Sequence, residues 1–227
     1  MISQTRSRKK GTVYREMRKQ IWKPGNMIYP LPVVMISVCD KKGNDNIITV
    51  AWTGTICTNP PMVYISIRPE RYSYDMIKES CEFVINLTTK ELAYATDYCG
   101  VRSGRDVDKF KAMNLTRTKG EYVNCPMIEE SPVNIECKVT EIKELGSHDM
   151  FIAEVLAVHA GEKYMDTKGK FHLSQSQPIV YSHGEYYDMG ELLGTFGYSV
   201  RKKHKKILAS KAVNKSSIQM TNPDSTL

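Results

Sequence analysis

Arg68 and Arg71 are separated by two residues, and hydroxyl side chains stand on both sides of them. A guanidinium group binds phosphate through paired hydrogen bonds, and hydroxyl groups supply further donors. The flanking pattern predicts a strand over residues 62–67 and a helix over residues 72–80, whose N-terminus favours an anion. The predicted phosphate site consists of Ser66, Arg68, Arg71, Tyr72 and Ser73, and which arginine binds the phosphate is left open.

A second candidate surface precedes this segment, on a run that predicts a strand over residues 47–52. Thr49, Ala51 and Thr53 alternate along it, and alternate residues of a strand share one face. Such a face, with its backbone groups and small hydroxyls, suits a flat polar ring, although an ordinary solvated face has the same pattern. The ring-binding surface and the phosphate site together predict a ligand that has a ring and a phosphate tail.

The elements that must position these residues are mainly strands. The turn residues 40–46 join two β-rich runs and predict a hairpin. Apolar alternation and turn signals predict strands over residues 30–39, 47–52, 62–67, 83–87, 133–142 and 150–158, with short strands through 181 and at 186–190. Helices are expected at residues 72–80, at 88–98 with Thr88 or Thr89 as the N-cap and an end before Gly100, at 107–113, and over a short stretch at 205–213.

The order of these motifs resembles a known family. It runs Asn-x-x-Thr-x-Ala-Trp-Thr-Gly, Asn-Pro-Pro, Arg-x-x-Arg-Tyr-Ser and Cys-Glu-Phe-Val-Ile-Asn-Leu. Gly-Ser-His-Asp-Met-Phe-Ile-Ala-Glu-Val and Pro-Ile-Val-Tyr follow further along the chain. This succession is similar to the flavin reductase-like family of FMN-binding split β-barrels, in particular its flavoredoxin-type branch.

The resemblance implies a mainly β fold with short helices, an FMN-binding split β-barrel. It also implies FMN as cofactor, with the flavin ring held largely by the backbone of one strand, here Thr49, Val50, Ala51, Trp52 and Thr53. The loop at residues 99–106 is expected to lie over the flavin. A homodimer is expected as well, because the family builds its flavin cleft at the subunit interface.

Further candidates for cofactor binding lie beyond the phosphate site. Asn86 ends a predicted strand, and its amide is either a strand-end cap or a flavin contact. Lys109 follows the predicted covering loop and has a charge suited to the phosphate or to the N1/O2 edge of the flavin. The candidates in this group are Asn86, Leu87, Ser103, Gly104 and Lys109.

His148 is the candidate catalytic residue. It stands in the Gly146-Ser147-His148 turn between two predicted strands, where a histidine is either exposed and idle or part of a site. The resemblance implies a position near the flavin or the incoming nicotinamide, where the imidazole orders the ring or stabilises negative charge on reduced flavin. No acid–base pair or nucleophile is required, because the cofactor carries the redox chemistry.

Composition and motifs do not favour several other classes of site. The six cysteines are spread without a Cys-x-x-Cys or Cys/His cluster, so no metal site is expected and the thiols are expected to be reduced in a cytoplasmic protein. No signal peptide and no membrane-spanning run is recognised. A Gly-x-Gly-x-x-Gly fingerprint is also missing, so a Rossmann site is unsupported.

The net charge of +7 is concentrated at the two ends of the 227-residue chain. This distribution predicts three regions: a basic leader at 1–22, a split-barrel domain at 23–200, and a basic, flexible tail at 201–227. Basic ends can contact nucleic acid or an anionic membrane, but they lack the interleaving of aromatic with basic residues and the folded scaffold of a sequence-reading module, so no specific nucleic acid is expected.

Three functional hypotheses follow from these features. In the first, an FMN-dependent oxidoreductase transfers electrons from NADH or NADPH to a flavin, a metal ion or another small acceptor. In the second, a flavoredoxin-like FMN protein exchanges electrons with a redox protein partner. The third and weakest hypothesis is a nucleic-acid or membrane-surface protein whose basic ends matter more than any flavin.

Overall fold

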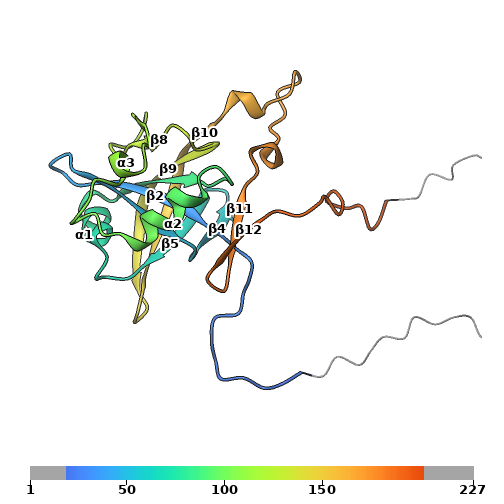
Figure 1. The fold of residues 1–227 in the computed structure, drawn as a ribbon, viewed down its shortest axis with the longest axis horizontal. Coiled ribbons are helices and arrows are strands. Elements are labelled where there is room, and N and C mark those ends of the chain that lie inside the picture. The colour runs from blue at the N-terminus through green and yellow to red at the C-terminus, as the bar shows by residue number, and fades with distance from the viewer. Residues whose placement is uncertain (1–18, 202–227) are drawn as a thin grey trace, which may run out of the picture. The chain divides into compact units, whose positions relative to one another are not determined.

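The computed structural model describes residues 19–201 (Figure 1). Contacts divide the chain after Met189 into two units, which are considered separately. Most of the predicted leader and tail, and the whole predicted helix at 205–213, lie outside the described residues. The predicted boundaries of the domain at 23–200 stay a prediction.

An antiparallel sheet of seven strands forms the centre of the first unit, in the order β3-β2-β6-β9-β10-β5-β4. Its longest pair, β9 and β10, forms a hairpin across the turn that carries His148. The strands are β2 (Val34–Cys39), β3 (Asp45–Val50), β4 (Thr53–Thr58), β5 (Pro61–Ile67), β6 (Glu82–Leu87), β9 (Val133–Glu144) and β10 (Asp149–Ala160).

Smaller elements complete this unit. A second sheet has the order β1-β11-β12, and β7 pairs with β8. These strands are β1 (Leu31–Pro32), β7 (Arg117–Thr118), β8 (Met127–Ile128), β11 (Ile179–Ser182) and β12 (Glu185–Asp188). The helices are α1 (Tyr72–Ser80), α2 (Ala93–Val101) and α3 (Lys109–Ala112), with short 3₁₀ turns at Glu162–Tyr164 and Leu173–Ser176. Within the described residues, none of the helices has the length and apolar character needed to cross a membrane.

One hydrophobic core joins six of the seven strands to α1. It contains Ile36 of β2, Ile65 of β5, Phe83 of β6 and Phe151 of β10, all of which have no exposed surface. Because residues from such distant positions in the strand order share one core, the sheet must curve around it. Burial of these large apolar side chains supplies the main driving force for the fold.

The opposite face of β2 and β3 is covered by α2 and α3 (Figure 1). Met35 and Ile47 pack there against Cys99 and Phe110. Both faces of β2 are therefore buried, which explains why its six residues are all buried and show no polar alternation. This layer brings the end of α2 beside β3, where the predicted ring-binding face begins.

The helix predicted at residues 88–98 has the wrong bounds. It begins at Ala93 and continues through Gly100 to Val101. Thr88 donates its hydroxyl hydrogen to the Val33 oxygen over 2.6 Å, and Thr89 forms a β-bridge, so tertiary contacts hold both residues outside the helix.

Gly100 was expected to end this helix, but its role is in packing. A Cβ at this position would lie 3.2 Å from Cβ of Thr49. The missing side chain therefore lets α2 approach β3 closely. This contact explains why a glycine stands inside the helix and does not end it.

The strand predicted at residues 47–52 also differs from the structure. β3 ends at Val50, the chain bends, and β4 forms a hairpin with β5 that the sequence did not predict. The helix predicted at 107–113 is shorter, at Lys109–Ala112. By contrast, the β9–β10 hairpin, the helix at 72–80 and the strand at 83–87 are confirmed.

Candidate functional site

A cavity of about 810 Å³ opens where β3, β5, the end of α2, the β9–β10 turn and the β11–β12 hairpin meet. This volume is large enough for a cofactor-sized ligand. The predicted residues that line it are Thr49, Val50, Ala51, Trp52, Ser66, Arg68, Arg71 and His148. Residues from both predicted surfaces and the candidate catalytic histidine therefore share one cavity.

Backbone and side-chain hydrogen bonds hold the cavity wall that β3 and β5 form. The Ser66 N–H donates to the Trp52 oxygen over 2.8 Å, which connects the two segments. Thr49 donates its hydroxyl hydrogen to the Thr96 oxygen of α2 over 2.5 Å. Thr53 is buried, does not line the cavity, and donates to the Tyr64 oxygen over 2.7 Å. The Thr49 and Thr53 hydroxyls therefore already have backbone partners, and the wall presents mainly backbone and apolar surface.

His148 faces this wall from the β9–β10 turn. Its ring is parallel to the Trp52 ring within 5°, with the ring centroids 6.1 Å apart. The Nδ1 atom lies 2.9 Å from Oγ of Ser147. Burial and then the neighbouring positive charge of Arg68 lower the pKa of His148 below its usual value. This shift favours the neutral imidazole, which can either donate or accept a hydrogen bond.

A smaller cavity of about 160 Å³ adjoins the large one, and Ile48, Arg71, Gly100 and Val101 line both. Positive charge gathers there, from Arg71, Arg102, Arg105 and Lys109. The predicted residues on its wall are Arg71, Tyr72, Ser73, Ser103, Gly104 and Lys109. The residues predicted to form one phosphate site are therefore divided between two adjoining cavities, and Arg71 lines both.

Polar and aromatic groups shape the small cavity. Ser73 at the start of α1 is 1% exposed and accepts a hydrogen bond from Nδ2 of Asn46 over 2.8 Å. The Arg105 guanidinium lies 5.3 Å from the centre of the Tyr72 ring, so a cation–π contact holds it over the cavity. A Cβ at Gly104 would overlap Oδ1 of Asn46 and lie 2.7 Å from Cδ1 of Tyr72. The glycine therefore keeps this compartment open.

Lys109 is buried, and its ammonium group is held from two sides. Nζ donates to the Ile47 oxygen over 2.6 Å and to the Cys99 oxygen over 2.8 Å. Burial is the main reason that the pKa of Lys109 falls to about 8. These bonds connect β3 to the end of α2, so Lys109 supports the cavity wall as well as adding charge to it.

Asn86 and Leu87 do not line either cavity. Asn86 has no exposed surface, and its Nδ2 donates to the Met35 oxygen and to Oγ of Ser37, each over 2.9 Å. Its Oδ1 accepts from the Ile128 N–H over 3.0 Å. Leu87 packs against the main core. Their contact with a cofactor stays a prediction, and the observed bonds give Asn86 a structural role.

Part of the large cavity was missed by the sequence analysis. Tyr181 and Tyr186 of the β11–β12 hairpin form an aromatic wall, with ring centroids 5.8 Å apart. Tyr186 donates its hydroxyl hydrogen to Oδ1 of Asp97 over 3.1 Å, and burial followed by this bond raises the pKa of Tyr186 to about 12. The signal available in the sequence was the pair of short tyrosine-bearing strands, but their position beside α2 depends on tertiary pairing.

The curved β fold thus places two cavities beside each other, one of about 810 Å³ and one of about 160 Å³ with several basic residues on its wall. Residues 26–190 match the flavin reductase-like domain. An uncharacterized protein of Archaeoglobus fulgidus is 31% identical over 152 residues, which cover 67% of this chain and 85% of that protein.

Two solved structures are similar over most of the chain. A flavoredoxin of Desulfovibrio vulgaris (Miyazaki F) has a TM-score of 0.76 and 30% identity, covering 81% of this chain and 100% of that chain. A flavoredoxin of Methanosarcina acetivorans has a TM-score of 0.74 and 28% identity, covering 82% and 100%. The chain belongs to the flavin reductase-like family, and the predicted mainly β split-barrel fold is confirmed.

Proposed function

We propose that this protein binds FMN and works as a flavin-dependent oxidoreductase. The observation that carries this proposal is that a cavity of about 810 Å³, bordered by the segment from Thr49 to Trp52, adjoins a smaller cavity lined by several basic residues, with Arg71 on both. A flavin mononucleotide has the matching parts, an extended aromatic ring and a phosphate. The family membership supports the same cofactor.

The residues on the two cavities fit this cofactor in charge and in shape. The backbone and apolar surface from Thr49 to Trp52 suits the ring, and Tyr181 extends the aromatic lining. We place the phosphate where the two cavities adjoin: Arg71 lines both and supplies one guanidinium group, while Arg68 and Ser66 lie on the side of the large cavity. We assign the phosphate to these arginines in preference to Lys109, whose ammonium already donates two hydrogen bonds to backbone oxygens.

Bound FMN would supply two-electron redox chemistry, and the protein's part is to bind, orient and shield the reacting ring. The parallel Trp52 and His148 rings border the site of reaction. A neutral His148 can donate a hydrogen bond without adding a full charge, and so favours negative charge as it develops on a neighbouring ring. We propose His148 as the catalytic residue in this sense.

Two electron donors are compatible with this site. NADH or NADPH as donor makes the protein a flavin reductase-like enzyme that passes electrons to a flavin, a metal ion or another small acceptor. The similarity to two flavoredoxins supports the alternative, an electron carrier that exchanges electrons with a protein partner. We place the reductase first because the 810 Å³ cavity is large enough to admit a second ring beside the flavin. A homodimer in the cytoplasm remains part of the proposal.

Visible absorbance distinguishes these functions. The purified protein is mixed with FMN, desalted, and treated anaerobically with NADH and then NADPH. Retained flavin that bleaches with either nucleotide supports the reductase, whereas flavin that bleaches only with dithionite supports the carrier. Absence of FMN binding in a titration, even at high protein concentration, would overturn both.

A further inference from the structure

Cys39 and Cys125 form a thiol pair away from the proposed flavin site. Cys39 is the last residue of β2, and Cys125 lies in the segment between β7 and β8. Their Sγ atoms are 3.0 Å apart, although the residues are 86 positions apart in the sequence. Cys39 is 5% exposed and Cys125 is completely buried. Neither residue lines the large or the small cavity, so the flavin proposal does not explain this pair.

The segment that carries Cys125 is held firmly in place. The buried Glu136 carboxylate accepts hydrogen bonds from the backbone N–H groups of Glu121, Tyr122 and Val123, over 3.0, 2.8 and 2.8 Å. Ser37, two residues before Cys39, donates its hydroxyl hydrogen to the Pro126 oxygen over 2.5 Å. The segments on either side of the thiol pair are therefore held by hydrogen bonds, and a bond between the two sulfur atoms requires no change of fold.

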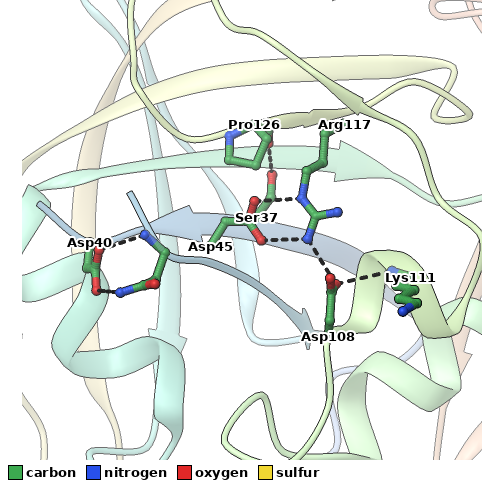
Figure 2. Close-up of polar contacts among 8 residues, drawn as sticks. Ser37, Asp40, Asp45, Asp108, Lys111, Arg117 and Pro126 are labelled. Atoms are coloured by element: carbon green, nitrogen blue, oxygen red, sulfur yellow. Dashed lines mark hydrogen bonds and ion pairs between the residues drawn. The ribbon is translucent and has the colours of Figure 1, made fainter. Parts of the chain in front are cut away.

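A separate cavity of about 350 Å³ gives solvent access to one side of the pair. Cys39 lines it together with Asn124 and Pro126, while Cys125 does not. Figure 2 shows part of the surrounding polar contacts: Arg117 donates to Asp45 over 2.7 and 3.0 Å and to Asp108 over 2.9 Å. Cys39 therefore borders this cavity, while Cys125 lies outside its lining.

We propose that Cys39 and Cys125 are a peroxide-reactive dithiol that closes reversibly into a disulfide bond. Cys39 attacks one oxygen of hydrogen peroxide as the thiolate, the O–O bond breaks, and the leaving hydroxide takes up a proton and departs as water. The Cys125 sulfur then attacks the sulfenic acid sulfur of Cys39, the S–O bond breaks, and a second water leaves with the Cys125 proton. Two thiols lose two electrons and two protons, and hydrogen peroxide is reduced to two water molecules.

The position of the cavity assigns the order of reaction, because Cys39 borders it and Cys125 does not. The hydrogen bond from Cys125 is the main cause that lowers the pKa of Cys39 below the usual thiol value. The same bond, followed by burial, raises the pKa of Cys125. Since the thiolate is the reactive form, Cys39 is the attacking residue and Cys125 the resolving residue. The position of Cys39 at the cavity and the opposite pKa shifts of the two thiols support the same assignment.

A metal site is the competing explanation, because a carboxylate oxygen of Glu82 lies within 4.8 Å of both sulfur atoms. Two thiolates on one tetrahedral zinc ion are about 3.8 Å apart, since each Zn–S bond is about 2.3 Å. The observed 3.0 Å is shorter. Glu82 also accepts hydrogen bonds from the N–H and the Nδ2 of Asn124, over 2.9 and 3.2 Å. The geometry therefore favours a dithiol over a metal centre.

Peptide mapping of the full-length protein tests this proposal. The reduced protein is desalted into EDTA-containing buffer, treated with hydrogen peroxide, alkylated under denaturing conditions and analysed by mass spectrometry. We expect a linked peptide that joins Cys39 to Cys125, protection of two of the six thiols, and reversal by dithiothreitol. Alkylation of both cysteines after peroxide treatment, or linkage of either one mainly to another cysteine, would overturn the proposal.

Variants separate the two roles. In C125S the resolving thiol is lost, so Cys39 should accumulate as a sulfenic acid that dimedone traps. The matched control is the double variant C57S/C81S, which removes two partly exposed cysteines outside the pair and should leave the Cys39–Cys125 linkage unchanged. Loss of the linkage in this control would contradict the proposal, and the result for the unmodified protein stands even if C125S fails to fold.

Discussion

Glu136 and the pair Arg68 and Arg71 are charged groups with opposite surroundings. The Glu136 side chain is completely buried, and its carboxylate accepts three backbone hydrogen bonds and lies 2.6 Å from Nε2 of His159. The Arg68 side chain is 49% exposed, and its Nη1 lies 3.9 Å from the Glu70 carboxylate. No ion pair of Arg71 is found within residues 19–201.

This difference distinguishes a structural charge from a binding charge. A buried carboxylate whose oxygens are fully hydrogen-bonded holds a segment of backbone, and removing it leaves several donors without a partner. Guanidinium groups that border a cavity have donors still available for a ligand. We therefore assign fold stability to the Glu136 region and anion binding to the arginine region.

The largest effect is expected from E136A. The substitution leaves three backbone N–H groups and His159 without their acceptor, so the free energy of unfolding should fall by about 3–5 kcal/mol. Urea denaturation measures this change. The control is E141A, an exposed position on the same strand, where we expect a change within about 0.5 kcal/mol. Equal stability of the two variants would contradict the assignment of Glu136.

The second-largest effect is expected from G104A, at the small cavity. The added Cβ would lie 2.5 Å from Cγ of Asn46, so the Asn46–Ser73 hydrogen bond must shift. We expect a loss of about 1–3 kcal/mol in stability, as for other overpacked sites, together with weaker FMN binding. Thermal unfolding with and without FMN measures both. G25A, where the added Cβ meets a neighbour only at 3.9 Å, serves as the control.

H148Q tests the chemistry without changing the proposed phosphate site. We expect the rate constant of flavin reduction by NADH to fall about tenfold, which is about 1.4 kcal/mol in the barrier. FMN affinity should change by less than about twofold, since the arginines remain. Stopped-flow absorbance under anaerobic conditions gives the rate. An unchanged rate constant would remove His148 from the mechanism.

The pH dependence of stability is the smallest expected effect. Burial opposes ionisation of Glu136, but hydrogen bonds from Glu121, Tyr122 and the other donors outweigh it, so the pKa of Glu136 is below 4.5 in the folded protein. A depressed folded-state pKa stabilises the protein above the unfolded-state value, and this stabilisation is lost as pH falls through the folded-state pKa. At pH values below about 4.5, the melting temperature of the unmodified protein should therefore decrease as the pH is lowered. The melting temperature of E136Q should decrease less over the same pH range.

Sequence patterns predicted the elements with strong local signals. The β9–β10 hairpin follows from alternation over many residues, and α1 follows from the change in pattern after Arg71. The order of motifs also brought Trp52, Arg68 and His148 together as candidates, and all three line one cavity. Where local signals agree with tertiary packing, prediction from sequence was sufficient.

The features that sequence did not reveal depend on contacts between distant segments. Thr88 is held outside a helix by Val33, and Gly100 is placed by its approach to Thr49. The strand β4 was missed because the bend after Val50 interrupts the apolar run. The Tyr181 wall likewise depends on the pairing of β11 with β1. No local pattern specifies such contacts.

The most direct test of the central claim compares the affinities of FMN and riboflavin, which differ by the phosphate. Fluorescence titration would be carried out on the unmodified protein, on R68A/R71A, and on K168A, an exposed charge that lines none of the three cavities. We predict that the unmodified protein and K168A bind FMN at least about tenfold more tightly than riboflavin, since hydrogen bonds to charged groups contribute about 1.5–3 kcal/mol. R68A/R71A should lose this preference. Equal affinity for both ligands in the unmodified protein, or a preference that survives in R68A/R71A, would contradict the assignment of the arginines to the phosphate.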